Sequence, residues 1–168
     1  MRDRIVQLFN QYSYFWAVGV IGLLLAAGLL NWRGGDRLVR LGIFVGYLIV
    51  VMVIYSRFQY PDNEAESLSQ VEAELRDGQP TLVVLYSQYC LACMAALPAV
   101  HDLEKDLQPD GVDILIVDIH SEGGGDVAEY FDFKTSPTFI LCDAAGHEIW
   151  RAHSAPSRNE VKDLLAPS

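Results

Sequence analysis

The chain has 168 residues, of which 51% are hydrophobic, yet its formal net charge is −10. These values do not fit one ordinary acidic soluble domain, so the apolar residues must be segregated along the chain. Residues 1–58 carry six Arg and two Asp, whereas residues 59–168 carry six Lys or Arg and twenty Asp or Glu. The split predicts a membrane part followed by an acidic globular part. So acidic a domain also excludes nucleic acid as a partner, because phosphate binding depends on Lys and Arg.

Two uncharged apolar runs occupy the basic segment, from Tyr14 to Leu30 and from Leu41 to Ser56. With their flanks they reach the about 20 residues that a helix needs to cross a bilayer. We predict a transmembrane helical hairpin over residues 1–58, with spans at about 12–31 and 38–56. A cleaved signal peptide is the alternative for the first run, but a second run follows at once. The connection is short, so both termini are expected on one side of the membrane.

The loop between the two runs carries Arg33, Arg37 and Arg40, and this density of Arg favours the cytoplasmic side. We therefore expect a two-pass protein of the plasma (inner) membrane whose C-terminal domain is extracytoplasmic, in the periplasm or a lumen. Aromatic residues are expected at the two interfaces: Tyr12, Tyr14, Trp16, Tyr55 and Phe58 at one, Trp32 at the other.

Gly42 and Gly46 in the second run have the small-xxx-small spacing that lets two helices approach closely. They would pack either against the first helix, where Gly19 and Gly22 offer a flat patch, or against another membrane protein. The sequence leaves both interpretations open.

The remainder is expected to be a linker at 59–66 and one α/β domain at 67–168. Alternating strand and helix patterns indicate a central mixed sheet flanked by helices, with parallel strands joined by right-handed crossovers. The predicted elements are a helix Glu64–Asp77, a buried strand Thr81–Tyr86, a helix from Cys90 to about Leu107 containing Pro98, a buried strand Val112–Ile119, a short helix Asp126–Phe131, a hairpin of strands Thr138–Cys142 and Glu148–Ala152, and a helix from about Ser157 to Leu165.

The motif Cys90-Leu91-Ala92-Cys93 stands where a buried strand passes into a helix. The first sulfur would lie at the helix N-terminus, where unpaired N–H groups and the helix dipole favour a thiolate. The second lies one turn further on, close enough to resolve a mixed disulfide. Cys90 is therefore the candidate nucleophile and Cys93 the candidate resolving thiol. This chemistry requires neither cofactor nor metal.

From about Ser67 to Leu165 the sequence resembles the thioredoxin superfamily. Four features carry the resemblance: Tyr-Cys-x-x-Cys after a buried strand, Pro98 five residues after the second Cys, the segment Thr135-Ser136-Pro137-Thr138, and a Gly-containing hairpin after it. The resemblance implies a cis-proline at Pro137 that lies against the cysteine pair, and a Ser136 backbone that pairs with a substrate strand. The residues implied to bind substrate are Tyr89, Leu91, Ala92, Ser136 and Pro137.

Three departures from the thioredoxin pattern concern the same site. The buried acid that assists proton transfer in thioredoxins is replaced by Val84, and the Trp before the first Cys is replaced by Tyr89. A different base, or water, would therefore have to deprotonate Cys93. The dipeptide Leu91-Ala92 is similar to that in the C-terminal domain of the bacterial transmembrane disulfide reductase DsbD.

Other roles for the cysteines remain open at this point. The pair could belong to a structural zinc site with two of His101, His120, His147 and His153, or form a permanent structural disulfide. Cys142 lies on a strand that the family alignment places near the active site, as a buried inert thiol or a third redox participant.

The sequence thus favours a membrane-tethered thiol-disulfide oxidoreductase that acts on protein thiols and disulfides of exported or membrane proteins. The alternative is an accessory subunit of a larger membrane complex, in which the hairpin and a thioredoxin-like domain serve for docking with little or no redox role.

Overall fold

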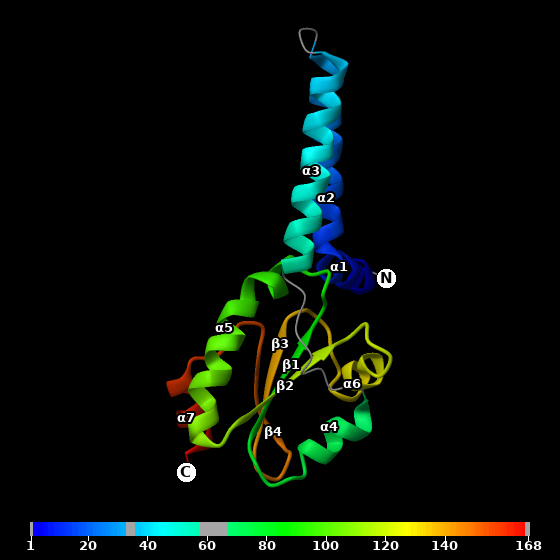
Figure 1. The fold of residues 1–168 in the computed structure, drawn as a ribbon. Coiled ribbons are helices and arrows are strands. Elements are labelled where there is room, and N and C mark those ends of the chain that lie inside the picture. The colour runs from blue at the N-terminus through cyan, green and yellow to red at the C-terminus, as the bar shows by residue number, and fades with distance from the viewer. Residues whose placement is uncertain (1, 33–35, 58–66, 167–168) are drawn as a thin grey trace.

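The computed structural model describes residues 2–32, 36–57 and 67–166. Two long helices stand on an α/β domain, and a short N-terminal helix lies across their junction (Figure 1). The elements are α1 (Arg2–Gln11), α2 (Ser13–Asn31), α3 (Arg37–Arg57), α4 (Leu68–Glu74), β1 (Thr81–Tyr86), α5 (Leu91–Leu107), a 3-10 turn η1 (Gln108–Asp110), β2 (Asp113–Asp118), α6 (Gly124–Tyr130), β3 (Thr138–Cys142), β4 (Glu148–Ala152) and α7 (Arg158–Leu165).

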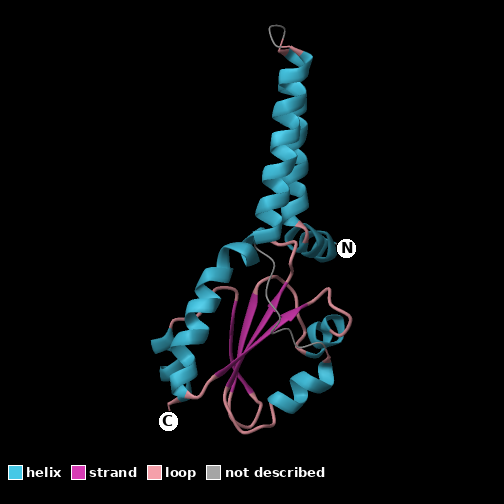
Figure 2. Ribbon diagram, viewed as in Figure 1, coloured by secondary structure: helices cyan, strands magenta, loops and turns pink. Residues whose placement is uncertain are grey.

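The sheet has the mixed topology that the sequence predicted, in the order β2-β1-β3-β4. β1 runs parallel to β2 and antiparallel to β3, and β3 is antiparallel to β4 (Figure 2). Leu85 near the end of β1 pairs with Thr138 at the start of β3. The loop that follows β1 and the loop that precedes β3 therefore meet at one edge of the sheet.

Alternate residues of β1 enter two separate cores, because side chains of a strand point to opposite faces. Leu82 and Val84 pack with residues of α5 and α7, while Val83 and Leu85 pack with residues of α4 and α6. The domain is thus a sheet between two helical layers, and β1 is buried along its whole length.

The helix ends differ slightly from the sequence predictions. α4 begins at Leu68, after Ser67, whose hydroxyl accepts the N–H of Gln70 at 3.3 Å. The predicted start at Glu64 and the predicted linker at 59–66 lie outside the described residues. α7 begins one residue after Ser157, which forms a capping box with Glu160.

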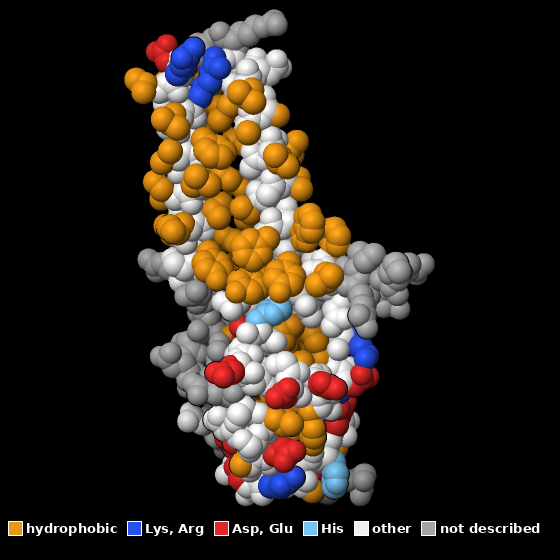
Figure 3. Space-filling model, turned by 90° about the vertical axis from the view of Figure 1, so that its right-hand side faces the viewer, with side chains coloured by type: hydrophobic (Ala, Val, Ile, Leu, Met, Phe, Trp, Pro, Cys, Tyr) orange, Lys and Arg blue, Asp and Glu red, His pale blue; other side chains and the backbone are white. Residues whose placement is uncertain are grey.

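α2 and α3 form a helical hairpin, and each is long and apolar enough to cross a membrane. Hydrophobic side chains cover the visible side of this hairpin, whereas Asp and Glu gather on the domain beneath it (Figure 3). The hydroxyl of Tyr47 on α3 donates to the carbonyl of Val18 on α2 at 2.6 Å, and the Tyr47 ring lies against Gly22.

The predicted roles of the other glycines in the hairpin need correction. A methyl group added at Gly42, Gly46 or Gly19 would meet no atom within 4 Å. The prediction that Gly42 and Gly46 pack closely against the first helix is therefore wrong, because no atom of that helix would meet a methyl group at either position.

α1 is an element that the sequence analysis did not predict as separate. The helical conformation is interrupted between α1 and α2 at Tyr12, whose φ and ψ of −112° and 24° are not helical. Tyr12 and Tyr14, which the sequence predicts at a membrane interface, make contacts within the protein: Tyr12 stacks on Tyr89, and Tyr14 is buried. Phe58 lies outside the described residues.

Candidate functional site

Cys90 is the N-cap residue of α5. Its φ and ψ of −99° and 119° are extended, and its sulfur accepts the backbone N–H of Cys93 at 3.4 Å. This places the sulfur where the unpaired N–H groups of the helix favour negative charge. Cys90 and Cys93 are both buried free cysteines.

The pKa values of the two thiols are shifted in opposite directions. Hydrogen bonding from Cys93 holds the pKa of Cys90 at about 6, below its ordinary value, although burial acts to raise it. The same interaction raises the pKa of Cys93, and burial raises it further. One nucleophilic thiolate beside one protonated thiol is the arrangement that stepwise disulfide exchange requires.

The loop before β3 lies against Cys90. The Ser136–Pro137 peptide bond is cis, and the Cys90 sulfur lies 3.8 Å from the Ser136 carbonyl oxygen. Nδ1 of His153 lies 3.1 Å from the Pro137 carbonyl oxygen and supports this loop from the end of β4. The predicted residues Ser136 and Pro137 are thus beside Cys90, but both are buried.

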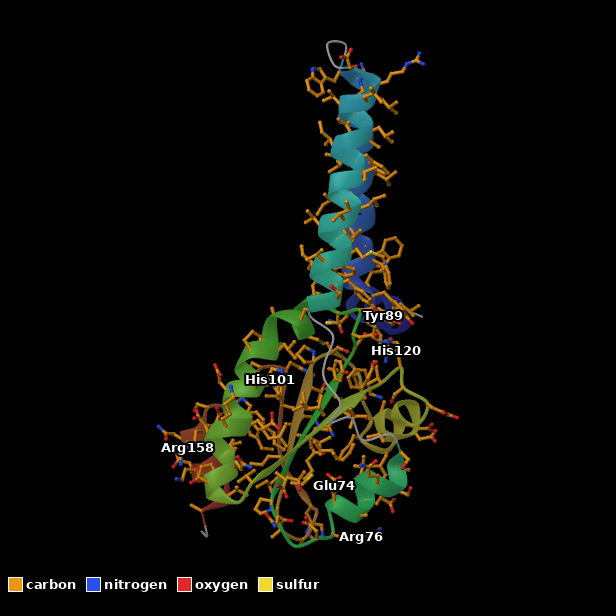
Figure 4. All side chains as sticks on the ribbon, viewed as in Figure 1. Glu74, Arg76, Tyr89, His101, His120 and Arg158 are labelled. Atoms are coloured by element: carbon orange, nitrogen blue, oxygen red, sulfur yellow. The ribbon has the colours of Figure 1, made fainter. Side chains whose placement is uncertain are left out.

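The remaining predicted substrate-binding residues surround the pair with unequal exposure. Leu91 is 42% exposed and Ala92 is exposed, at the first turn of α5. Tyr89 is half-buried in an aromatic cluster with Tyr12, Phe15 and His120. Figure 4 shows Tyr89 and His120 close together where the hairpin meets the domain.

A polar cluster that the sequence analysis missed lies behind the loop of Cys90. The buried carboxylate of Asp118 accepts Nε2 of Gln88 at 3.0 Å and the backbone N–H of His120 at 3.1 Å. Nε2 of His120 lies 3.1 Å from the Ser87 hydroxyl. Burial raises the pKa of Asp118, although the hydrogen bonds from His120 and Gln88 act to lower it. The domain therefore has a buried acid near the site, at the end of β2 and not at Val84 of β1.

Residues from the α1–α2 junction also contact the site, and no local pattern pointed to them. Asn10 hydrogen-bonds Ser136, Gln11 accepts from Ser87, and Ser13 accepts the N–H of Leu91. Their partners are 76 or more residues away along the chain. A signal in the sequence would have to relate the polar residues before the first apolar helix to a loop of the α/β domain.

The expectation that Cys142 lies near the active site is wrong. Cys142 pairs with Thr81 at the start of β1, whereas Cys90 follows the end of β1. The distance from Thr138 to Cys142 along β3 is about 13 Å at about 3.3 Å per residue. Cys142 belongs to the opposite core, and burial raises its pKa to about 11. It has the surroundings of an inert core thiol.

The histidines do not assemble a zinc site with the cysteine pair. In the part of the chain that the structure describes, no group of three or more His, Cys, Asp and Glu side chains could hold a metal ion. His147 lies beside Asp143 in the β3–β4 turn, and His101 lies on α5 facing Glu104.

Comparison with solved structures finds thioredoxins. The Malassezia sympodialis thioredoxin superposes with a TM-score of 0.51 at 17% identity, covering 60% of this chain and 84% of that one. The Plasmodium falciparum thioredoxin gives 0.50 at 18% identity, covering 60% of this chain and 93% of that one. No protein-family model matches the sequence, and no curated protein is significantly similar to it. The domain after the helical hairpin has the thioredoxin fold.

Proposed function

We propose that the protein is a membrane-tethered thiol-disulfide oxidoreductase in which Cys90 is the nucleophile and Cys93 the resolving thiol. One observation carries the proposal: the Cys90 sulfur caps α5, accepts the Cys93 N–H at 3.4 Å and faces the Ser136 carbonyl at 3.8 Å. A buried pair with only a packing role would not need one thiol whose pKa is about 6.

In the reductive direction, the Cys90 thiolate attacks one sulfur of a substrate disulfide. A Cys90–substrate bond forms as the substrate S–S bond breaks, and the departing thiolate takes up a proton. Cys93 then loses its proton and attacks the Cys90 sulfur, which expels the second substrate thiolate. Two electrons reach the substrate, and the Cys90–Cys93 disulfide is reduced again by a dithiol protein.

Proton transfer from Cys93 needs an acceptor, since its pKa is raised. Val84 cannot serve, and its side chain is buried in the apolar core beside α5. Once Cys90 is bonded to the substrate, its interaction with Cys93 no longer raises the pKa of that thiol, and we assign the first departing substrate thiolate as the proton acceptor.

The substrates that we propose are exported or membrane proteins. Two observations support this: the helices α2 and α3 are apolar enough to cross a membrane, and Cys90 lies at their base. The Arg-rich connection favours an extracytoplasmic domain. A thiol introduced at exposed Ser154 (Ser154→Cys) tests this, since a membrane-impermeant maleimide should label it on intact cells, and protection until lysis would contradict it.

Substrate trapping tests the proposed reaction. The Cys93→Ser variant, expressed at native level in cells, is expected to accumulate mixed disulfides between Cys90 and discrete partner proteins. The Cys90→Ser, Cys93→Ser double variant is the matched control and should yield none. An absence of adducts in the single variant, with a membrane complex still co-purifying, would contradict exchange chemistry and favour the accessory-subunit alternative.

A further inference from the structure

The backbone of Ser136 is already paired within the chain. Nδ2 of Asn10 donates to the Ser136 carbonyl at 3.0 Å, and Oδ1 of Asn10 accepts the Ser136 N–H at 2.7 Å. A side-chain amide offers the same donor and acceptor as a peptide group. Asn10 therefore makes the two bonds that a neighbouring strand would make, at the residue that the thioredoxin resemblance assigns to substrate pairing.

The residues after Asn10 continue along the loop of Cys90. The Gln11 carbonyl accepts the Ser87 hydroxyl at 2.9 Å, and the Ser13 hydroxyl accepts the Leu91 N–H at 2.9 Å. The Tyr14 N–H donates to the Tyr89 carbonyl at 3.0 Å. We call residues Asn10–Tyr14 the capping segment.

An aromatic contact adds to these hydrogen bonds. The Tyr12 ring stacks on Tyr89 with centroids 5.6 Å apart and lies 5.3 Å from the His120 ring. Such separations are typical of favourable ring pairs. Cys90, which lies between Tyr89 and Leu91 in this contacted loop, is 0% exposed.

We propose that the groove beside Cys90 is a docking site for the chain's own capping segment, which must leave before Cys90 can attack a disulfide. The inference rests on the proposed function, since it concerns access to the same thiol. A substrate disulfide has to bring a sulfur into line with the Cys90 sulfur, and a residue that is 0% exposed gives it no access. The protein is closed at rest and opens for a partner that displaces residues 10–14.

The junction has features that permit release without unfolding the domain. The backbone at Tyr12 is not helical, so α1 and α2 are already separate rods that can rotate about this residue. A cavity of about 410 Å³ lies beside the segment, lined by Gln7 and Gln11 of the N-terminal region and by Ala128, Glu129 and Asp132 near α6. The hydrogen bonds to be broken join polar groups that water or a partner's backbone can satisfy.

The location of the segment also indicates the kind of partner. Leu8 and Phe9 on α1 and Trp16 on α2 are exposed apolar side chains at the base of the hairpin, and Phe9 stacks on Trp16. Such a surface suits the membrane interface. The displacing partner is therefore a protein segment at the membrane surface that offers backbone donors and acceptors to Ser136.

Thiol accessibility in the purified full-length chain tests the proposal. The reduced protein in lipid nanodiscs is treated with iodoacetamide at pH 8, where Cys90 is already a thiolate, and modification of each cysteine is followed by mass spectrometry. Wild-type Cys90 should react slowly. Asn10→Ala removes both bonds to Ser136 and should raise the Cys90 rate by about tenfold or more. Asn159→Ala, the same change at an exposed residue of α7, is the matched control and should not.

A second variant separates opening from unfolding. Tyr12→Ala removes the ring stacking and leaves Asn10 in place, and it should raise the Cys90 rate while buried Cys142 stays unmodified. Wild-type Cys90 that reacts as fast as a thiol in an unfolded peptide would overturn the proposal. Joint labelling of Cys90 and Cys142 in both variants would also overturn it, because the segment would then be part of the folding core.

The outcome is independent of substrate trapping. A freely reactive wild-type Cys90 that still traps partners would defeat the capping proposal and leave the proposed function intact. Slow wild-type labelling relieved by Asn10→Ala, without trapped partners in cells, would support capping and defeat the proposed function.

Discussion

The backbone N–H of Cys93 points at the sulfur of Cys90 from 3.4 Å, so that the N-cap of α5 is a thiol. An N-cap side chain ordinarily accepts such an N–H with a neutral or carboxylate oxygen. With sulfur in that place, capping the helix and stabilising the thiolate become the same interaction. The stability of α5 and the acidity of Cys90 are therefore linked.

The first prediction concerns the pH dependence of the reduced protein. Thiolate absorbance in the ultraviolet should rise with a midpoint at about pH 6, and Cys90→Ser should remove this step. Since the folded pKa lies below the about 8.5 of an ordinary thiol, the thiolate stabilises the reduced fold fully above that pH. This contribution is lost as the pH falls through about 6. A midpoint near 8.5 in the folded wild type would contradict the assignment of Cys90.

The second prediction concerns Asp118, whose pKa is raised chiefly by burial. The native state then holds a proton that the unfolded state has lost, over the range between the ordinary Asp pKa and the raised one. The free energy of unfolding should fall as the pH rises through that range. Asp118→Asn should remove this dependence in urea titrations at several pH values. Parallel pH profiles for wild type and variant would show that Asp118 titrates normally.

The third prediction uses two adjacent glycines at the start of α6. A methyl group at Gly124 would overlap the carbonyl oxygen of Asp118, whereas one at Gly125 would meet no atom within 4 Å. Gly124→Ala should cost about 1–3 kcal/mol of unfolding free energy by displacing the end of β2. Gly125→Ala should cause no loss and gain up to about 1 kcal/mol of helix propensity. Equal effects of the two substitutions in chemical denaturation would contradict the packing described here.

The fourth prediction is that Cys142 takes no part in redox chemistry. It is fully buried, and burial raises its pKa to about 11, so little thiolate forms at neutral pH. A maleimide should modify Cys142 only after addition of denaturant. Cys142→Ala should leave partner trapping by Cys93→Ser unchanged. Modification of Cys142 in the native chain at the rate of Cys90 would contradict its place in the core.

The strands of the sheet could be predicted because their signals are local. Thr81–Tyr86, Thr138–Cys142 and Glu148–Ala152 form β1, β3 and β4 with the bounds expected from apolar runs and flanking turn residues. The position of Cys142 could not be predicted in the same way, because the strand pattern does not show in which direction β3 runs relative to the site. β3 starts beside Cys90 and runs away from it, so its last residue lies at the far end.

The closed state of the site could not be predicted for a different reason. Tyr12 and Tyr14 were interpreted as interfacial residues because a membrane surface and a protein contact select the same amphipathic aromatic side chains. Asn10 lies 126 residues from Ser136, and one polar residue before an apolar run has no distinctive pattern. Contacts between the N-terminal helices and a distant loop depend on tertiary structure alone.

A redox equilibrium of the full-length chain is the most direct test of whether Cys90 and Cys93 form a reversible disulfide. The protein is incubated to equilibrium in buffers of graded reduced and oxidised glutathione, quenched with acid, denatured and labelled with a maleimide for mass analysis. We expect Cys90 and Cys93 to lose their free thiols together in one reversible transition, with Cys142 labelled throughout. Three free thiols across the whole series, or a disulfide that includes Cys142, would contradict a redox-active Cys90–Cys93 pair.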